Sequence, residues 1–207
     1  NINQGSPTAS PVVTTTYTVV GTDAIGCVNS DQTTLVVQPV PNAAYAGNVV
    51  CIGDSMTFEN QSTPYQLDYF WEFGDGQTST DSIPTILYQA EGVYNVTMVA
   101  TLGNCSDNAS GTVTVNPVPT SLFSATPTYT TALEPLIHFE DFSENAISWS
   151  WDFGDGSPFS TEQHPAYFFS DTGFQVITLT TFNSFGCPDS ISDSIYIAPY
   201  TTLYVPS

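Results

Sequence analysis

Two short stretches of the sequence place carboxylates beside aromatic rings, a combination that could cleave sugars or bind calcium. The first is FWEFGDG, from Phe70 to Gly76, and the second is WSWDFGDG, from Trp149 to Gly156. Paired carboxylates can act as acid and base on a glycosidic bond, and clustered carboxylate oxygens suit Ca²⁺. The same residues can also form a β-strand that runs into a tight turn, so the surrounding elements must decide.

Alternation along both stretches favours the strand and turn. The aromatic residues that share one strand face are Tyr69, Trp71 and Phe73 in the first stretch and Trp149, Trp151 and Phe153 in the second. The turns that follow are Gly74-Asp75-Gly76 and Gly154-Asp155-Gly156, in which glycine supplies positive φ and aspartate supplies Asx hydrogen bonds. We therefore predict a structural turn motif in which Asp75 and Asp155 accept backbone amides of their own turns. Phe70 alternates outward and could contact a partner.

The charge balance excludes several classes of function. The 207 residues contain no Lys or Arg against 20 Asp and Glu, for a formal charge of −20. Nucleic acids and anionic lipid surfaces are bound through basic side chains, so we exclude both as partners. No apolar run approaches the length of about 20 residues that spans a bilayer. The missing bases are explained either by selection against proteases that cut after Lys or Arg, or by drift in a Ser/Thr-rich repeat protein.

The sequence contains an internal repeat of about 80 residues. The two aromatic stretches align, and GVYNVTMVAT from Gly92 matches GFQVITLTTF from Gly173. Apolar and polar residues alternate in short runs between turn-forming clusters, which indicates antiparallel strands. The predicted inward faces are Tyr94, Val96, Met98 and Ala100 in the first repeat and Phe174, Val176, Thr178 and Thr180 in the second. The fold class is therefore all-β, as tandem immunoglobulin-like β-sandwiches.

The repeat divides the chain into four segments. We expect the C-terminal hairpin of a truncated immunoglobulin-like repeat at 1–38, complete sandwiches at 39–117 and 118–199, and a lead-in to a further domain at 200–207. Proline-containing VQPVP and VNPVP are expected to be stiff linkers. A lone hairpin is marginal in water. The first segment therefore either ends a preceding sandwich or pairs with another chain by strand addition.

The four cysteines and two histidines offer little chemistry. Cys51 and Cys105 lie in one repeat, and we predict a disulfide between them that closes a loop of about 55 residues and stabilises by about 4 kcal/mol. Cys187 has no partner within its own repeat, and Cys27 is expected to bond upstream sequence. His138 and His164 have no neighbouring nucleophile in the sequence, so a structural role is expected. The spacing of the cysteines does not suit zinc.

The repeated motifs resemble a known family. WEFGDG with EGVYNVT, and WDFGDG with TGFQVITL, resemble the polycystic kidney disease (PKD) domain, an immunoglobulin-like sandwich marked by W-D-F-G-D-G and then G-x-Y-x-V. The resemblance covers about 41–199; Glu72 stands where the family usually has Asp, and Phe174 where it usually has Tyr. TYTVVGTDAIGC resembles the end of immunoglobulin-like repeats in very large bacterial surface proteins. TTLYVPS resembles the lead-in to the gliding-motility-associated C-terminal domain, a type IX secretion signal.

The resemblance implies a non-enzymatic stalk or spacer of a secreted adhesin or filament, on the outer surface of a Gram-negative bacterium and involved in adhesion or gliding motility. Its partners would be other protein chains or surface glycans, with no membrane insertion, and the terminal strands could mediate self-association. The alternative is an accessory module of a secreted hydrolase that binds glycan or protein through exposed aromatics such as Phe70 or Phe159. Neither implies a catalytic residue.

Two further sites follow from the resemblance. Some PKD-like domains bind calcium, for which the carboxylates here are Glu140, Asp141 and Asp171. We otherwise expect no cofactor. Asp-Ser-apolar triplets resemble the O-glycosylation signal of bacteria with type IX secretion, and their serines are Ser55, Ser82, Ser190 and Ser194.

Overall fold

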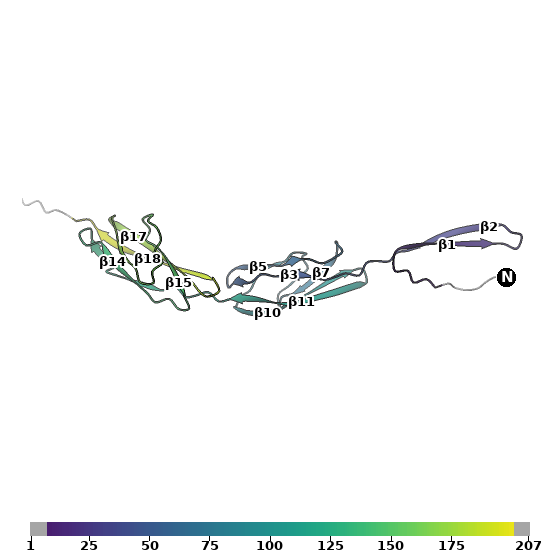
Figure 1. Ribbon diagram of the computed structural model, residues 1–207, viewed down its shortest axis with the longest axis horizontal. Helices are drawn as coiled ribbons and strands as arrows, with labels where there is room; N and C mark the ends of the chain where they lie inside the picture. The colour runs from purple at the N-terminus through teal and green to yellow at the C-terminus, as the bar shows by residue number, and fades with distance from the viewer. Residues whose placement is uncertain (1–7, 201–207) are drawn as a thin grey trace, which may run out of the picture. The chain divides into compact units, whose positions relative to one another are not determined.

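The computed structural model describes residues 8–200, which form β-strands joined by turns and loops (Figure 1). None of these residues is helical, and so no helix among them could cross a membrane. By their internal contacts the residues form two compact units. The first contains residues up to Gly47, then Thr57–Thr85 and Tyr94–Thr112; the second contains Asn48–Met56, Ile86–Val93 and the residues from Val113 onward.

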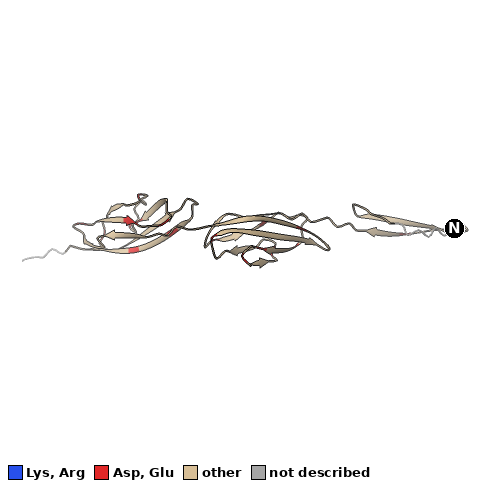
Figure 2. Ribbon diagram, turned by 90° about the horizontal axis from the view of Figure 1, so that it is seen from below, with Lys and Arg blue, Asp and Glu red and all other residues tan. Residues whose placement is uncertain are grey.

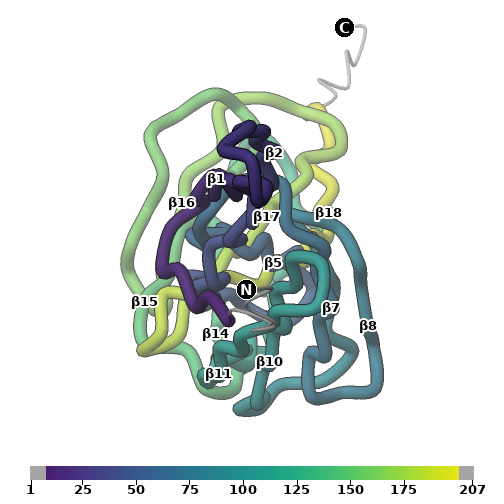
Figure 3. The backbone as a smooth tube through the Cα atoms, turned by 90° about the vertical axis from the view of Figure 1, so that its right-hand side faces the viewer, coloured from purple at the N-terminus to yellow at the C-terminus, as the bar shows by residue number. Residues whose placement is uncertain are grey.

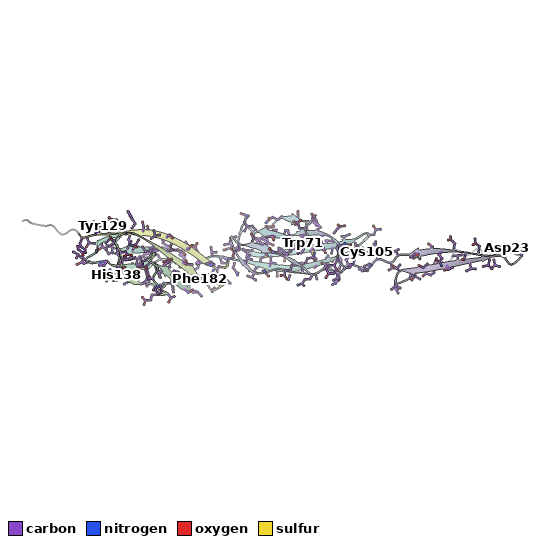
Figure 4. All side chains as sticks on the ribbon, turned by 90° about the horizontal axis from the view of Figure 1, so that it is seen from above. Asp23, Trp71, Cys105, Tyr129, His138 and Phe182 are labelled. Atoms are coloured by element: carbon purple, nitrogen blue, oxygen red, sulfur yellow. A yellow bond between two sulfur atoms is a disulfide. The ribbon has the colours of Figure 1, made fainter. Side chains whose placement is uncertain are left out.

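The first unit begins with a hairpin, in which β1 (Thr15–Thr22) pairs antiparallel with β2 (Val28–Leu35). Every residue of β2 is exposed. The turn between the strands is closed by Asp23, at the tip of the hairpin in Figure 4, whose Oδ1 accepts the amides of Ile25 at 2.9 Å and Cys27 at 2.8 Å. The sequence thus forms the predicted hairpin, held by backbone pairing rather than by a buried face.

Next along the chain are the strands of the first repeat. The largest sheet has the order β4-β11-β10-β7-β8, and the pairs β3-β6 and β5-β9 form two smaller sheets. β10 pairs antiparallel with β7, whereas β4 pairs parallel with β11. The strands are β3 (Tyr45–Ala46), β4 (Val50–Cys51), β5 (Ser55–Thr57), β6 (Glu59–Asn60), β7 (Asp68–Glu72), β8 (Thr78–Ser79), β9 (Thr85–Leu87), β10 (Gly92–Leu102) and β11 (Cys105–Asn116).

Aromatic side chains form the centre of the first unit's core. Phe58, Trp71 and Phe73 are all completely buried. Ring centroids lie 5.6 Å apart for Phe58 and Trp71 and 5.2 Å apart for Phe58 and Phe73, distances typical of attractive aromatic packing. Tyr45 meets Trp71 edge-on at 5.2 Å and donates its hydroxyl to the Val96 carbonyl at 2.8 Å. The alternation predicted for the first stretch is confirmed.

The second unit contains the strands of the second repeat. Its sheets have the orders β12-β14-β16 and β13-β18-β17-β15. β17 and β18 pair from Gly173↔Ile197 to Phe182↔Pro188 and can be followed toward the yellow end of the tube in Figure 3. The strands are β12 (Phe123–Thr126), β13 (Tyr129–Thr131), β14 (Leu136–Asp141), β15 (Ser148–Asp152), β16 (Ala166–Phe168), β17 (Gly173–Phe182) and β18 (Pro188–Ala198).

The predicted inward face of β17 is wrong. Phe174 is 75% exposed and Val176 is 56% exposed, whereas Ile177 and Leu179 are completely buried. The second repeat has one more residue than the first between its Trp and this strand, and a slip of one residue reverses the faces of a strand. Gln175, not Phe174, therefore occupies the place of Tyr94, and its Nε2 donates to the Asp171 carbonyl at 3.4 Å.

Candidate functional site

The aspartates of the two turn motifs act within their own turns, as predicted. Asp75 Oδ1 accepts the Gln77 amide at 3.0 Å, and Asp155 Oδ1 accepts the Ser157 amide at 3.0 Å. The hydroxyl of Tyr167 donates to Asp155 Oδ2 at 2.7 Å, and this bond, with those from Ser157, lowers the pKa of Asp155. A carboxylate held ionised in this way is a poor general acid, so the motif has the features of a structural turn.

The first glycine of each turn passes close to a neighbouring strand. Gly74 has a φ of 83°, and a Cβ there would lie 2.5 Å from the Asn95 carbonyl oxygen. Gly154 has a φ of 80°, and a Cβ there would collide with the carbonyl oxygen of Val176. Only glycine satisfies both the backbone conformation and the close approach. These positions fix where each turn packs against the following long strand.

The buried tryptophans attach the turn motif to the loop that follows it in sequence. Trp71, labelled in Figure 4, donates its Nε1 proton to the Asp81 carbonyl at 2.9 Å. Trp151 does the same to the Glu162 carbonyl at 2.8 Å. Both rings are completely buried, so the indole N–H needs this partner. The two repeats therefore use their tryptophans in the same way.

The candidate calcium ligands do not converge. Among residues 8–200, no group of three or more His, Cys, Asp or Glu side chains is placed to hold a metal ion. Glu140 and Asp171 are exposed, while the buried Asp141 faces the opposite side of β14 from Glu140. In Figure 2, the acidic positions marked in red on the second unit are separated from one another.

Asp141 instead organises a hydrogen-bond network. Its Oδ2 accepts Trp149 Nε1 at 2.7 Å and Gln163 Nε2 at 3.0 Å, and its Oδ1 accepts the Ser143 amide at 3.0 Å. Burial alone would raise the pKa of Asp141, but the bonds from Ser143, Gln163 and Trp149 outweigh it and lower the pKa. The network ties β14 to the start of β15, and sequence patterning gave no sign of it.

Both histidines of the chain line one shallow pocket beside Glu140. His164 Nδ1 accepts the Asp141 amide at 3.1 Å, so this nitrogen is occupied in a structural bond. No cysteine or serine lines the pocket. The arrangement offers a hydrogen-bond role rather than a nucleophile and base pair.

The predicted Cys51–Cys105 disulfide is wrong. The structure joins Cys51 to Cys187, with their Cα atoms 5.7 Å apart, and leaves Cys105 free. Cys105, labelled in Figure 4, begins β11, whereas Cys51 pairs with Asn116 at the other end of that strand. An extended strand rises about 3.3 Å per residue, so about 35 Å of β11 lies between the two positions, far beyond the reach of a disulfide.

A row of three aromatic side chains, two exposed and one half-buried, crosses three strands of the second unit. Phe174 on β17 and Tyr129 on β13 both pair in register with Tyr196 on β18. Ring centroids are 4.9 Å apart for Phe174 and Tyr196 and 5.8 Å apart for Tyr129 and Tyr196. Phe174 is 75% exposed and Tyr129 is 62% exposed. The sequence analysis did not predict this row, because it placed Phe174 on the inward face of β17.

The other sequence-predicted surface residues lie as follows. Phe70 is 46% exposed and Phe159 is 63% exposed. All four serines of the Asp-Ser-apolar triplets are exposed: Ser55, Ser82, Ser190 and Ser194. Residues 201–207 of the predicted C-terminal lead-in lie outside the described residues.

Comparison with known proteins identifies the class of domain. The family model described as the PKD domain matches residues 36–117 and again residues 115–198. The chain therefore belongs to the PKD domain family, with two copies in tandem, and it has the all-β, immunoglobulin-like fold expected of that family.

Individual relatives come from species of Vibrio. A microbial collagenase of Vibrio alginolyticus is 41% identical over 75 residues, which are 34% of this chain and 9% of the collagenase. The PKD1 domain of the metalloprotease PrtV of Vibrio cholerae is 33% identical, with a TM-score of 0.35, and the match covers 38% of this chain and 99% of that domain. The PKD1 domain of Epp of Vibrio anguillarum is 19% identical, with a TM-score of 0.35, covering 40% and 95% of the two chains.

Membership of the PKD family indicates what kind of module the chain is. The chain spans about a tenth of the curated relative it matches, so it corresponds to a module of that protein. PKD domains are non-catalytic accessory modules, and they occur in extracellular proteins. The Cys51–Cys187 disulfide fits such an oxidising compartment.

Proposed function

We propose that the chain is a non-enzymatic stalk segment of a secreted surface adhesin or filament, which acts as a spacer under tension. The observation that carries the proposal is the pairing of early and late strands in each repeat. β4 pairs parallel with the end of β11, and β13 pairs parallel with the end of β18. Strands near opposite ends of a repeat that run parallel slide past one another when those ends are pulled apart. Their hydrogen bonds are then loaded together, in shear.

Single-molecule force spectroscopy tests the proposal. The 207-residue chain is stretched between handles at its two ends in a reducing buffer, so that every cysteine is a thiol. We expect two abrupt unfolding events, each releasing about 270 Å of chain for a repeat of about 80 residues. Gradual extension at low force, without discrete events, would show that the repeats do not resist tension.

The proposal includes the segment boundaries and the location. We propose the C-terminal hairpin of a truncated immunoglobulin-like repeat at 1–38, PKD repeats at 39–117 and 118–199, and a sorting-domain lead-in at 200–207. We propose that the protein lies on the outer surface of a Gram-negative bacterium with type IX secretion. Antibodies against the chain should label intact producing cells without permeabilisation. Labelling that appears only after the outer membrane is opened would contradict the surface location.

We also propose O-glycosylation at the exposed serines Ser55, Ser82, Ser190 and Ser194. An intact mass measured on protein from the producing organism should exceed the polypeptide mass, and the excess should fall when these serines are replaced by alanine. A mass equal to that of the bare polypeptide would refute the modification.

A second function is favoured by the collagenase relative and by the aromatic row. As an accessory module of a secreted hydrolase, the chain would bind glycan or protein through Phe174, Tyr196 and Tyr129, since exposed rings stack well on apolar faces. Co-sedimentation with insoluble collagen or polysaccharide should then fall in a Phe174→Ser/Tyr129→Ser variant. Phe142→Ser is the matched control, because Phe142 is 50% exposed in the same unit but lies outside the row. Equal binding by both variants would exclude the row as the site.

A further inference from the structure

We propose that the Cys51–Cys187 disulfide is an extension lock, which keeps most of both PKD repeats from unravelling when the chain is pulled. The inference rests on the proposed function, because a lock matters only in a chain under tension. The two cysteines are 136 residues apart in sequence. Cys51 lies in the first match to the PKD family and Cys187 lies in the second.

The lock follows from the path that tension takes. A force applied at the two ends passes along the chain to Cys51, across the sulfur–sulfur bond, and onward from Cys187. Everything between these residues becomes a closed loop outside that path, so the parallel pairs β4–β11 and β13–β18 bear load in shear only when the bond is reduced. The loop can lose its folded structure without adding length, whereas an open chain gains about 3.3–3.6 Å for each residue that unravels.

Local contacts hold both cysteines at the segment that joins the two repeats. Cys51 pairs with Asn116, and the following amide, Ile52 N, donates to the Asn116 carbonyl at 2.8 Å. On the other side, Asn183 Nδ2 donates to the carbonyl of Pro117 at 2.7 Å. The two sulfurs are therefore positioned by two neighbouring residues of the chain, Asn116 and Pro117.

The turn that carries Cys187 is itself fixed. Asn183 Oδ1 accepts the amides of Phe185 and Cys187, both at 3.0 Å, and the Cys187 amide carbonyl accepts Asn183 N at 3.1 Å. Cys187 is completely buried, whereas Cys51 is half-buried. A reductant would thus reach the bond from the side of Cys51.

Formation of the bond needs a disulfide-bearing oxidant, such as a thiol–disulfide oxidoreductase of the secretory compartment. The Cys51 thiolate attacks the oxidant's disulfide, forms a mixed disulfide and releases one thiolate. The Cys187 thiolate then attacks the Cys51 sulfur and releases the second. Two cysteine thiols are oxidised, the oxidant's disulfide is reduced to two thiols, and the two cysteine protons pass to the solvent or the released thiolates.

The test compares extension with and without the bond. In non-reducing buffer, the wild-type chain should gain less length on full extension than the Cys51→Ser chain, by about 450 Å for the residues of the loop. Wild-type protein in reducing buffer should gain the full length, which checks the result if the serine variant folds poorly. The matched control is Cys27→Ser/Cys105→Ser, which removes the two free cysteines and should stay locked.

The possible outcomes distinguish a failure of the disulfide lock from a failure of the stalk function. If the oxidised wild-type chain releases the full length, the lock is refuted, even if both repeats show discrete events after reduction. If the reduced chain extends without such events, the stalk function fails, although the oxidised chain can still be short.

Mass spectrometry of a non-reduced digest should also find the Cys51 and Cys187 peptides joined, and a different pairing would overturn the proposal. Because trypsin finds no site, the digest uses a protease that cuts at acidic residues.

Discussion

The first glycine of each turn motif should be far more sensitive to substitution than the second. Gly74 and Gly76 both have positive φ, at 83° and 93°, so alanine at either position costs about 1–2 kcal/mol in backbone conformation. Alanine also lowers the conformational entropy of the unfolded chain, and this offsets about 0.4–1 kcal/mol of that cost. At Gly76 nothing lies within 4 Å of the added Cβ, so the net loss for Gly76→Ala is about 1 kcal/mol.

At Gly74 the added Cβ also meets the backbone of Asn95 on β10, with the carbonyl oxygen at 2.5 Å and the nitrogen at 3.0 Å. A strand backbone cannot move aside as a flexible side chain can, and overpacking of this kind costs about 1–3 kcal/mol more. We therefore expect Gly74→Ala to lose about 3 kcal/mol in the free energy of unfolding.

Differential scanning calorimetry measures the contrast between the two variants. For a repeat of about 80 residues, 1 kcal/mol shifts Tm by about 4–8 °C, so Gly74→Ala should lower Tm by about 15 °C and Gly76→Ala by about 5 °C. Circular dichroism at 20 °C should first confirm that both variants fold. The pair Gly154→Ala and Gly156→Ala repeats the test in the second repeat, where Gly156 also has open space around it. Equal Tm shifts within each pair would refute the close-approach argument.

Three other predictions concern the second repeat and metal. Because the pKa of Asp141 is lowered, its bonds stabilise the fold above the ordinary carboxyl pKa of about 3.9 and are lost as pH falls through the lowered value. Tm measured from pH 7 to pH 2 should therefore drop less steeply for Asp141→Asn than for wild type, and parallel curves would contradict this. Trp151→Phe should lower the free energy of unfolding by about 2–4 kcal/mol, through lost ring volume and an unpaired Glu162 carbonyl, and a calorimetric loss under 1 kcal/mol would show that the bond is unimportant. Chelation with EDTA should leave Tm unchanged, and a fall of more than about 4 °C, equivalent to about 1 kcal/mol, would reveal a stabilising metal.

The features that could be predicted from sequence are those set by neighbours along the chain. Alternation of Trp71 and Phe73 fixes which side of β7 enters the core. The Gly-Asp-Gly that follows fixes the turn and the hydrogen bond that the Gln77 amide donates to Asp75. Each of these depends on only a few consecutive residues. Their appearance twice in the chain made the immunoglobulin-like fold and the repeat evident before any contact was known.

The features that were missed depend on registers or on contacts between distant residues. One additional residue before β17 exchanged its faces, so Phe174 lies outside and Gln175 inside. The partner of Cys51 could not be chosen without knowing that Cys51 pairs with the far end of β11. Asp141 was predicted as a calcium ligand, although its Oδ2 accepts hydrogen bonds from Trp149 and Gln163, which lie on other segments.

The absence of Lys and Arg limits which interactions can hold the two repeats together, and the disulfide is one that remains. A formal charge of −20 without any Lys or Arg means that carboxylates on the two repeats repel one another, and no Lys or Arg ion pair can hold the repeats together. At physiological ionic strength, salt screens this repulsion between carboxylates that lie more than about 8 Å apart, but it supplies no attraction. The covalent bond between Cys51 and Cys187 is independent of salt and pH in a way that an ion pair is not. A disulfide is therefore the kind of cross-link that a chain of this composition can maintain at any ionic strength.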